Sequence, residues 1–256
     1  MVESSSPAST AGAQPGGVRM GVVIPLADEA DTVDELLSRV AAQLTPADRV
    51  FCVVDESSTD NTRQLVEACA GRDARVTLIW APENRCVVDA YFRGYRAAFD
   101  CGARWILEMD GGLSHLPEQI PRFIAAMEDG LDLAAGCRFI EGGSYHGRIS
   151  RRLLSRGGSM LARRLLGTAM LDMTSGFECF SRRAMQHVLT QGVRSRAHFF
   201  QTEIRYMLRD WKWREIPITY ANPSTRVGSA SLIESLRILW QLHRQSRKQR
   251  SDQKRG

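Results

Sequence analysis

The chain has 256 residues, of which 43% are hydrophobic and 25% are charged, a balance typical of a globular protein that can bury a sizeable core. No stretch approaches the roughly 18 to 20 apolar residues that a membrane-spanning helix needs, and the chain does not begin with a basic segment followed by an apolar one, as a secretory signal does. The six cysteines are scattered without CxxC pairs, which argues against a zinc site or a disulfide framework and indicates reduced thiols in a cytoplasmic protein.

The formal net charge is +5, and the excess of arginine and lysine is concentrated in residues 148–164 and in the last dozen residues. Such patches attract anions, so we expect contact with the phosphates of a substrate or with an acidic lipid surface. The sequence contains no recognisable nucleic-acid-binding module and no basic stripe with interleaved aromatic residues. We therefore expect no nucleic-acid partner.

Residues 1–17 are rich in Ser, Ala, Gly, Pro and Gln and have almost no large apolar side chains, which predicts a disordered tail. From Met20 onward, short apolar runs that are typical of strands buried on both faces alternate with amphipathic helical patterns. The expected strands are residues 20–25, 50–55, 76–80, 105–110 and 131–138. The expected helices are residues 32–42, 61–70, 88–101 and 118–128. This alternation predicts an α/β fold over residues 18–230, a single Rossmann-like domain with a mainly parallel central sheet flanked by helices.

Acidic residues follow three of these strands. Asp28 and Glu29 come just after the first, Asp55 closes the second, and Asp110 closes the fourth. In a parallel sheet these positions converge on the carboxyl edge, where ligands bind. Several carboxylates gathered there are costly unless they bind a cation, a ribose hydroxyl or a base N–H group. The alternative is that some of these acids, like Ser114, cap the helices that follow.

Seven segments share their order and spacing with a known family. They are VVIPLADEA (22–30), VVDESSTDNT (53–62), EMDGGLSHLPEQIP (108–121), GCRFIEGG (136–143), LSRGGSMLARRLLG (154–167), DMTSGFECF (172–180) and FFQTEI (199–204). Through them, residues 21–232 resemble glycosyltransferase family 2 of the GT-A fold, and within it the dolichol-phosphate or polyprenol-phosphate mannose synthases.

The resemblance implies a nucleotide-sugar site. Pro25 and Glu29 would lie under the nucleotide, Asp55 would accept a hydrogen bond from the base, and Arg138 would contact the sugar diphosphate. Asp110 matches the first acid of the Asp-x-Asp motif, which holds Mg²⁺ or Mn²⁺ across the diphosphate.

The sequence departs from the family at the second acid of that motif, where Gly112 stands. The next polar position that can act as a metal ligand is Ser114, so the metal candidates are Asp110 and Ser114. A site with one carboxylate keeps more water and should bind the cation weakly.

The acceptor side is also implied by the resemblance. The candidates for binding the acceptor phosphate are Arg151, Arg152 and Arg156 on one predicted helix, together with Arg226 in the segment RVGSASL (226–232). The family usually carries a basic residue after a GxS motif, at the position of Ser231 here, and Arg226 would substitute for it. Guanidinium groups suit phosphate oxygens well. The alternative for each is a solvated basic surface.

Asp172, with the Thr174 to Gly176 segment, resembles the acceptor-side loop, and Gln201 with Glu203 resembles the segment that faces the reaction centre. A phosphate acceptor is already anionic and needs no strong base. A hydroxyl acceptor would need one, and Glu203 or Asp172 would be the candidates. The catalytic candidates are thus Asp110, Arg138, Asp172, Gln201 and Glu203.

Residues 231–256 predict an amphipathic helix that continues into a basic tail. Three roles remain open for it: packing on the core, contact with a membrane surface and contact between copies of the chain. The expected function is an inverting transfer of a hexose from a GDP- or UDP-sugar to a polyprenyl or dolichyl phosphate, by a cytoplasmic protein peripheral to the inner membrane face. One alternative is a soluble hydroxyl acceptor such as a secondary metabolite or glycan. The other is a catalytically weakened relative that binds nucleotide, as Gly112 suggests.

Overall fold

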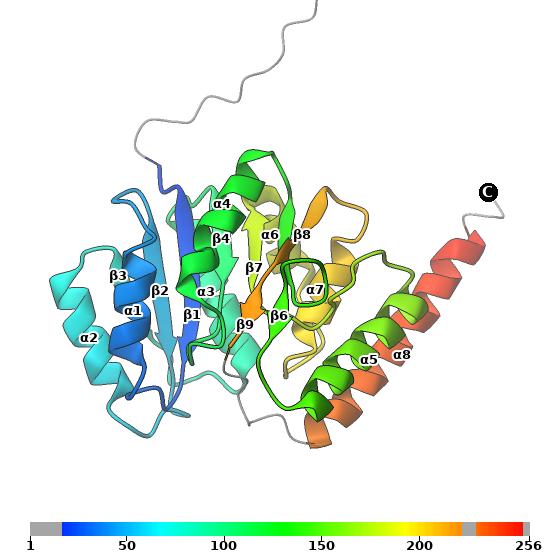
Figure 1. Ribbon diagram of the computed structural model, residues 1–256, viewed down its shortest axis with the longest axis horizontal. Helices are drawn as coiled ribbons and strands as arrows, with labels where there is room; N and C mark the ends of the chain where they lie inside the picture. Colours follow the sequence, from blue (N-terminus) through cyan, green and yellow to red (C-terminus); the bar gives the residue numbers. More distant parts are fainter. Residues whose placement is uncertain (1–16, 222–228, 253–256) are drawn as a thin grey trace, which may run out of the picture.

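The computed structural model describes residues 17–221 and 229–252, with side chains for 17–221 and 231–247. A seven-stranded sheet with the order β3-β2-β1-β4-β7-β5-β8 lies between two layers of helices (Figure 1). The predicted α/β fold with a mainly parallel sheet is confirmed. Of the predicted disordered tail, residues 1–16 lie outside the described residues, as does Arg226.

The five predicted strands are all present, with bounds that differ by at most two residues at either end. They are β1 Met20–Leu26, β2 Arg49–Val54, β3 Val76–Trp80, β4 Trp105–Glu108 and β5 Leu133–Cys137. The sequence did not predict β7 Glu178–Ser181 and β8 Trp213–Pro217, or the small pair of β6 Ser144–Tyr145 with β9 Thr219–Tyr220.

The predicted helices are also present. They are α1 Val33–Ala41, α2 Thr62–Arg72, α3 Val87–Asp100 and α4 Ile120–Glu128, the last preceded by the 3₁₀ turn η1 Pro117–Gln119. Beyond them lie α5 Ile149–Leu166, α6 Arg182–Gln191, α7 Phe200–Met207 and α8 Ser229–Asp252. No helix in the described part of the chain is both long and apolar enough to cross a membrane.

The core lies on both faces of the sheet because successive strand residues point to opposite sides. On β1, Val22 and Ile24 pack with residues of α1, α2 and α4, whereas Val23 packs on the other face with residues of α3, α6 and α7. All three valine and isoleucine side chains are fully buried, and each such burial stabilises the fold by about 1.5–3 kcal/mol. The two faces explain why the strands read as continuous apolar runs.

Strand β7 runs antiparallel to both of its neighbours, β4 and β5. Its first residue therefore lies at the edge of the sheet where β4 and β5 end. The segment that leads into β7, residues 172–176, is carried to the same edge as the loops that follow β1, β2 and β4. This strand is what joins the two halves of the site.

Helix α8 packs along α5 at one end of the molecule (Figure 1). Ile238, Leu239 and Leu242 on α8 are buried in the same cluster as Ala162 and Leu166 on α5. Helix α5 is capped at its carboxyl end by Gly167, whose φ of 69° suits glycine. Packing on the core, one of the three roles open for the carboxyl-terminal helix, is therefore present for one side of α8.

Candidate functional site

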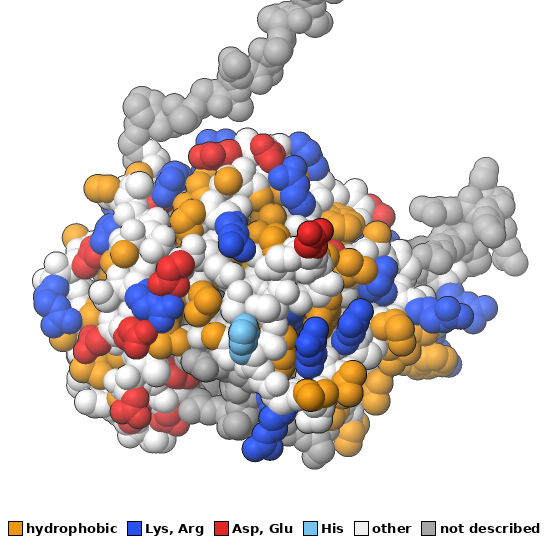
Figure 2. Space-filling view, viewed as in Figure 1, with side chains coloured by type: hydrophobic (Ala, Val, Ile, Leu, Met, Phe, Trp, Pro, Cys, Tyr) orange, Lys and Arg blue, Asp and Glu red, His pale blue; other side chains and the backbone are white. Residues whose placement is uncertain are grey.

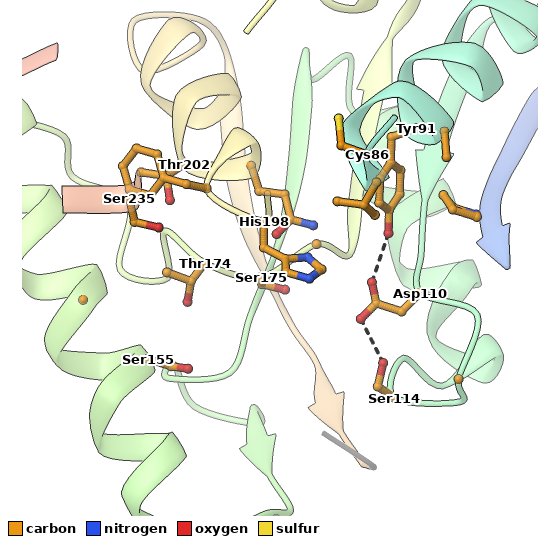
Figure 3. A pocket seen from close by; sticks show the side chains of 18 of the residues that line it. Cys86, Tyr91, Asp110, Ser114, Ser155, Thr174, Ser175, His198, Thr202 and Ser235 are labelled. Atoms are coloured by element: carbon orange, nitrogen blue, oxygen red, sulfur yellow. Dashed lines mark hydrogen bonds between the residues drawn. The ribbon is translucent and has the colours of Figure 1, made fainter. Parts of the chain in front are cut away.

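A cleft of about 1160 Å³ opens at the carboxyl edge of the sheet and extends to α5 and α8. Figure 3 shows its interior, where side chains from α3, α5, α7 and the loop after β4 point into one space. Eight of the residues predicted for the site line it: Pro25, Glu29, Asp55, Asp110, Ser114, Arg138, Arg151 and Gln201. The fold thus brings residues from most of the predicted segments into one cleft.

Asp55 forms one end of the cleft, at the end of β2. Its Oδ1 accepts hydrogen bonds from the amide of Ser57 at 3.0 Å and from the hydroxyl of Ser57 at 2.5 Å, and its Oδ2 accepts one from Asn84 Nδ2 at 3.2 Å. These bonds fix the carboxylate at the edge of the cleft, where it can accept a further hydrogen bond. This is the chemistry that recognition of a ring N–H requires.

Asp110 lies near the middle of the cleft, just beyond β4 (Figure 3). Its Oδ1 accepts a hydrogen bond from the hydroxyl of Tyr91 at 3.0 Å, and its Oδ2 accepts one from Ser114 Oγ at 2.9 Å. Its amide donates to Nδ1 of the buried His115 at 3.0 Å. Burial opposes the charged carboxylate, but His115, the Ser114 bond and His198 outweigh it and lower the pKa of Asp110. Asp110 is therefore a fixed anion.

The resemblance to glycosyltransferase family 2 implies a divalent cation, and the oxygen donors at this point fit Mg²⁺ or Mn²⁺. Asp110 and Ser114 offer hard oxygen ligands, the type that both ions prefer. Within the described ranges there is no group of three or more His, Cys, Asp or Glu side chains that would hold an ion alone. Mg²⁺ is commonly held by one or two carboxylates together with substrate phosphates and water. A cation here would thus depend on the bound diphosphate.

Arg138 also lines the cleft, directly after β5. Its Nε and Nη2 donate to the two carboxylate oxygens of Asp172 at 2.7 and 2.8 Å, and Nη2 also donates to Thr174 Oγ1 at 2.7 Å. The ring centroids of Tyr145 and Tyr220 lie 5.8 and 5.3 Å from the guanidinium carbon. Burial opposes the charged form of Asp172, but Arg138 more than compensates and lowers its pKa. Asp172 lies behind Arg138 and holds it, rather than lining the cleft itself.

Gln201 enters the cleft from α7. Its Nε2 donates to Oε1 of the fully buried Glu108 at 3.3 Å. Its side chain also packs on Gly176, where an added Cβ would fall 1.9 Å from that nitrogen. Burial raises the pKa of Glu108 well above its usual range, and the nearby carboxylates of Glu178 and Asp110 raise it further.

Glu203 does not line the cleft. Its carboxylate accepts hydrogen bonds from the amides of Arg194 and Ser195, the latter at 2.7 Å, and so anchors the loop before α7. On α5 only Arg151 of the three predicted arginines lines the cleft, while Arg152 and Arg156 are exposed.

Tyr91, Asn84 and His198 are polar cleft residues that were not singled out from the sequence. Tyr91 falls on the apolar side of α3, where spacing alone assigns it to the core. Asn84 follows β3, and polar residues at strand ends were the signal that would have found it. His198 precedes the predicted FFQTEI segment, and Figure 3 shows its ring turned toward Asp110 and Ser175. Its position beside a motif that faces the site was the available signal.

Comparisons with known proteins identify the fold and the family. Solved structures with the same fold include glucosyl-3-phosphoglycerate synthase from Mycobacterium tuberculosis in complex with Mn²⁺, UDP-glucose and phosphoglyceric acid. It has a TM-score of 0.66 and 16% identity, over 89% of this chain and 80% of that one. The same enzyme with Mg²⁺ and UDP has a TM-score of 0.64 and 15% identity, over 90% of this chain and 79% of that one. These neighbours are GT-A glycosyltransferases, which confirms the predicted fold class.

Two curated relatives are similar over most of their length. Polyprenol monophosphomannose synthase from Mycolicibacterium smegmatis is 29% identical over 82% of this chain and 80% of the relative. Undecaprenyl-phosphate mannosyltransferase from Micrococcus luteus is 28% identical over 79% of this chain and 84% of the relative. The model of the family described as glycosyl transferase family 2 matches residues 21–189, a span that runs from the second residue of β1 to beyond β7 and includes most of the cleft residues. The chain belongs to glycosyl transferase family 2 and is a glycosyltransferase.

Proposed function

We propose that the protein transfers a hexose, with inversion, from a GDP- or UDP-sugar to a polyprenyl or dolichyl phosphate. The two curated relatives are named for mannosyl transfer to such lipids, which makes mannose the first sugar to test. The single observation that carries the proposal is the composition of the cleft. The same cleft that holds Asp55 and Asp110 is walled at its far end by apolar side chains of α5 and α8, namely Leu154, Leu161, Leu232, Leu236 and Leu239.

This composition suits a substrate pair of opposite character. The carboxylates at the strand ends suit the ribose and base of a nucleotide, and Arg138 and Arg151 suit phosphate oxygens. The leucine side chains suit a hydrocarbon chain. A soluble sugar acceptor would leave the apolar wall without a role. With the nucleotide at the carboxylates and the hydrocarbon chain at the leucines, the acceptor phosphate would meet the donor sugar between them, near Arg138.

In the proposed reaction, an oxygen of the acceptor phosphate attacks the anomeric carbon from the side opposite the diphosphate. The bond from that carbon to the diphosphate oxygen breaks, and its electron pair leaves with the nucleoside diphosphate. The nucleophile is already anionic, so no side chain has to remove a proton, and positioning supplies most of the rate. A cation bound at Asp110 and the diphosphate would neutralise the charge that develops on the leaving group.

We also propose that the outer side of α5 and α8 rests on an anionic membrane surface. Ile149, Leu153 and Met160 on α5 are 75%, 64% and 67% exposed, and Ile233 and Trp240 on α8 are 70% and 53% exposed. Their spacing places each set along one stripe of its helix. Exposed arginines accompany them: Arg152, Arg156, Arg164, Arg237, Arg244 and Arg247. We call this surface the α5–α8 face.

Figure 2 shows hydrophobic side chains with Lys and Arg side chains beside them over the end of the molecule where α5 and α8 lie. Hydrophobic and cationic groups together are the signature of an interfacial helix, and each arginine near an anionic surface contributes about 1 kcal/mol to binding. The face adjoins the apolar end of the cleft, where a lipid acceptor would enter.

The transfer is tested with purified protein, GDP-mannose or UDP-glucose labelled in the sugar, and a short polyprenyl phosphate in detergent micelles. Movement of label into the organic phase, with release of the nucleoside diphosphate, is the expected result. Release of nucleoside diphosphate only when a water-soluble glycan is added would contradict the lipid acceptor. No turnover with any donor would contradict the transferase assignment of the site.

The membrane contact is tested by sedimentation with phosphatidylglycerol vesicles and with phosphatidylcholine vesicles. We expect binding to the anionic vesicles that weakens in high salt and that falls in the variant Ile233→Ser/Trp240→Ser and in Arg156→Gln/Arg244→Gln. The matched control Arg63→Gln/Arg72→Gln removes two arginines from α2, away from the face, and should bind like the parent. An equal loss of vesicle binding in the control would contradict the proposal. So would a dimer in solution whose interface is the α5–α8 face.

A further inference from the structure

We propose that Glu29 supplies the second carboxylate that Gly112 cannot, so that Glu29 and Asp110 together hold the divalent cation over the donor diphosphate. The inference rests on the proposed function, because the cation has a role only beside a bound nucleotide sugar. In the Asp-x-Asp motif both metal-binding carboxylates come from the loop after β4. Here the second carboxylate would come from the loop after β1.

The geometry around Gly112 points to this exchange. A Cβ added at Gly112 would lie 3.2 Å from Oε1 and 3.3 Å from Oε2 of Glu29. The carboxylate of Glu29 thus lies where a side chain at position 112 would project. Both residues line the cleft together with Asp110. The backbone at Gly111 is equally close to β1, since a Cβ there would lie 2.9 Å from the carbonyl oxygen of Pro25.

Glu29 is held firmly in this place. Its amide donates to Thr62 Oγ1 at 2.8 Å, and its carboxylate accepts a hydrogen bond from Thr32 Oγ1 at 3.1 Å. The preceding residue, Asp28, has a φ of 53° and accepts a bond from the amide of Thr59 at 2.7 Å. Bonds from both sides of the turn therefore fix the direction of Glu29, which is what a metal ligand needs.

The donor set gains a second charge by this arrangement. A cation held by Asp110 alone would keep most of its water and bind weakly, whereas two carboxylates and the diphosphate complete a common arrangement for Mg²⁺ and Mn²⁺. The φ of Gly112 lies outside the left-handed region, so the backbone does not call for a glycine on that ground. A side chain at position 112 would instead press on the Glu29 carboxylate, which would have to shift by a few tenths of an ångström to make room.

The test measures Mn²⁺ binding directly, by the loss of the free-ion electron paramagnetic resonance signal, with the full-length protein and saturating GDP or UDP. Outer-shell groups alone change metal affinity by roughly 10- to 100-fold, so removing a ligand in Glu29→Gln should weaken Mn²⁺ binding by at least about tenfold. The swap Glu29→Ala/Gly112→Asp should restore most of that affinity. The control Glu56→Gln removes an exposed carboxylate next to Asp55 that does not line the cleft, and should leave Mn²⁺ binding unchanged.

The outcomes separate the two proposals. Nucleotide that binds the parent protein with no Mn²⁺ uptake, or Glu29→Gln with unchanged Mn²⁺ affinity, would overturn the role of Glu29 and leave the transferase function in place. Loss in Glu29→Ala without recovery in the swap, with both variants folded by circular dichroism, would also overturn it. Failure of the parent protein to bind any nucleotide would instead contradict the proposed function.

Discussion

Asp172 binds Arg138 through both carboxylate oxygens, at 2.7 and 2.8 Å, and the pair is almost fully buried, with 0% and 5% of the side chains exposed. The Asp172 carboxylate thereby orients the guanidinium group of Arg138, which lines the cleft. Asp172 acts on the site through Arg138, and Thr174 adds a third fixed contact.

Asp172→Asn keeps the shape of the side chain but leaves the Arg138 charge buried without a counter-charge. Breaking a buried pair in this way costs about 3–5 kcal/mol, so the free energy of unfolding in urea should fall by that amount. Asp129→Asn is the control, since its pair with Arg214 is more than half exposed and should change stability by less than about 1 kcal/mol. Similar losses in the two variants would contradict the role given to the Asp172 pair.

Asp55→Ala should weaken nucleotide binding. It removes the acceptor that we assign to the base, and a hydrogen bond to a charged group contributes about 1.5–3 kcal/mol, which is at least tenfold in the dissociation constant. Calorimetric titration with GDP and UDP measures the effect. Glu56→Ala, which removes the exposed neighbouring acid, should titrate like the parent. A titration curve for Asp55→Ala like that of the parent would show that the base does not bind at Asp55.

Glu203→Gln tests whether Glu203 acts as a base. Because the carboxylate accepts from the amides of Arg194 and Ser195, the substitution should lower the free energy of unfolding by about 1–3 kcal/mol. The pH dependence of kcat should keep its shape, since the side chain does not face the cleft. A lost acidic limb of the pH profile, in a variant that is still folded, would restore Glu203 as the catalytic base for a hydroxyl acceptor, because a base loses activity when it is protonated at low pH.

Glu108→Gln should change how stability depends on pH. An unfolded glutamate has a pKa near 4.3, and burial raises the pKa of Glu108 in the folded protein. Above about pH 4.3 the folded state therefore binds more protons than the unfolded state, so stability falls as pH rises toward the folded pKa and then levels off. Glutamine is neutral throughout and escapes this loss.

Unfolding in urea across pH 4 to 8 checks the expectation. The stability of Glu108→Gln relative to the parent should increase with pH over that range, while its bond with Gln201 is kept because the amide oxygen still accepts. Glu128→Gln, at an exposed position on α4, should follow the parent at every pH. A constant difference between Glu108→Gln and the parent would show that Glu108 is ionised in the folded protein.

The periodicity of the sequence predicted the parallel half of the sheet well, because strands buried on both faces consist of an uninterrupted run of apolar residues. Residues 76–80 match β3 at both ends. Strand β7 was not predicted because it begins with the buried Glu178, a charged residue that interrupts the apolar pattern. That carboxylate pairs with Arg205, which lies 27 positions further along the chain. The sequence around Glu178 therefore does not reveal the partner that allows a glutamate to be buried in this strand.

The site was predictable where a motif fixes a strand end, as at Asp55 and Asp110. It was less predictable on helices, where the direction of each side chain matters. Residues two apart on a helix point to different sides, so Gln201 and Glu203 cannot both face the cleft. For the same reason Arg151 reaches the cleft while its neighbour Arg152 is exposed.

The reversed direction of β7 also bears on the order in which the protein is built. Strands β1 to β4 pair with one another using residues 20–108, so the nucleotide side can take shape while later parts of the chain are still being synthesised. Strand β7 has to enter between β4 and β5, and only then does the segment before it reach Arg138. We expect the growing chain to acquire its donor half first and to complete the acceptor half when β7 is inserted.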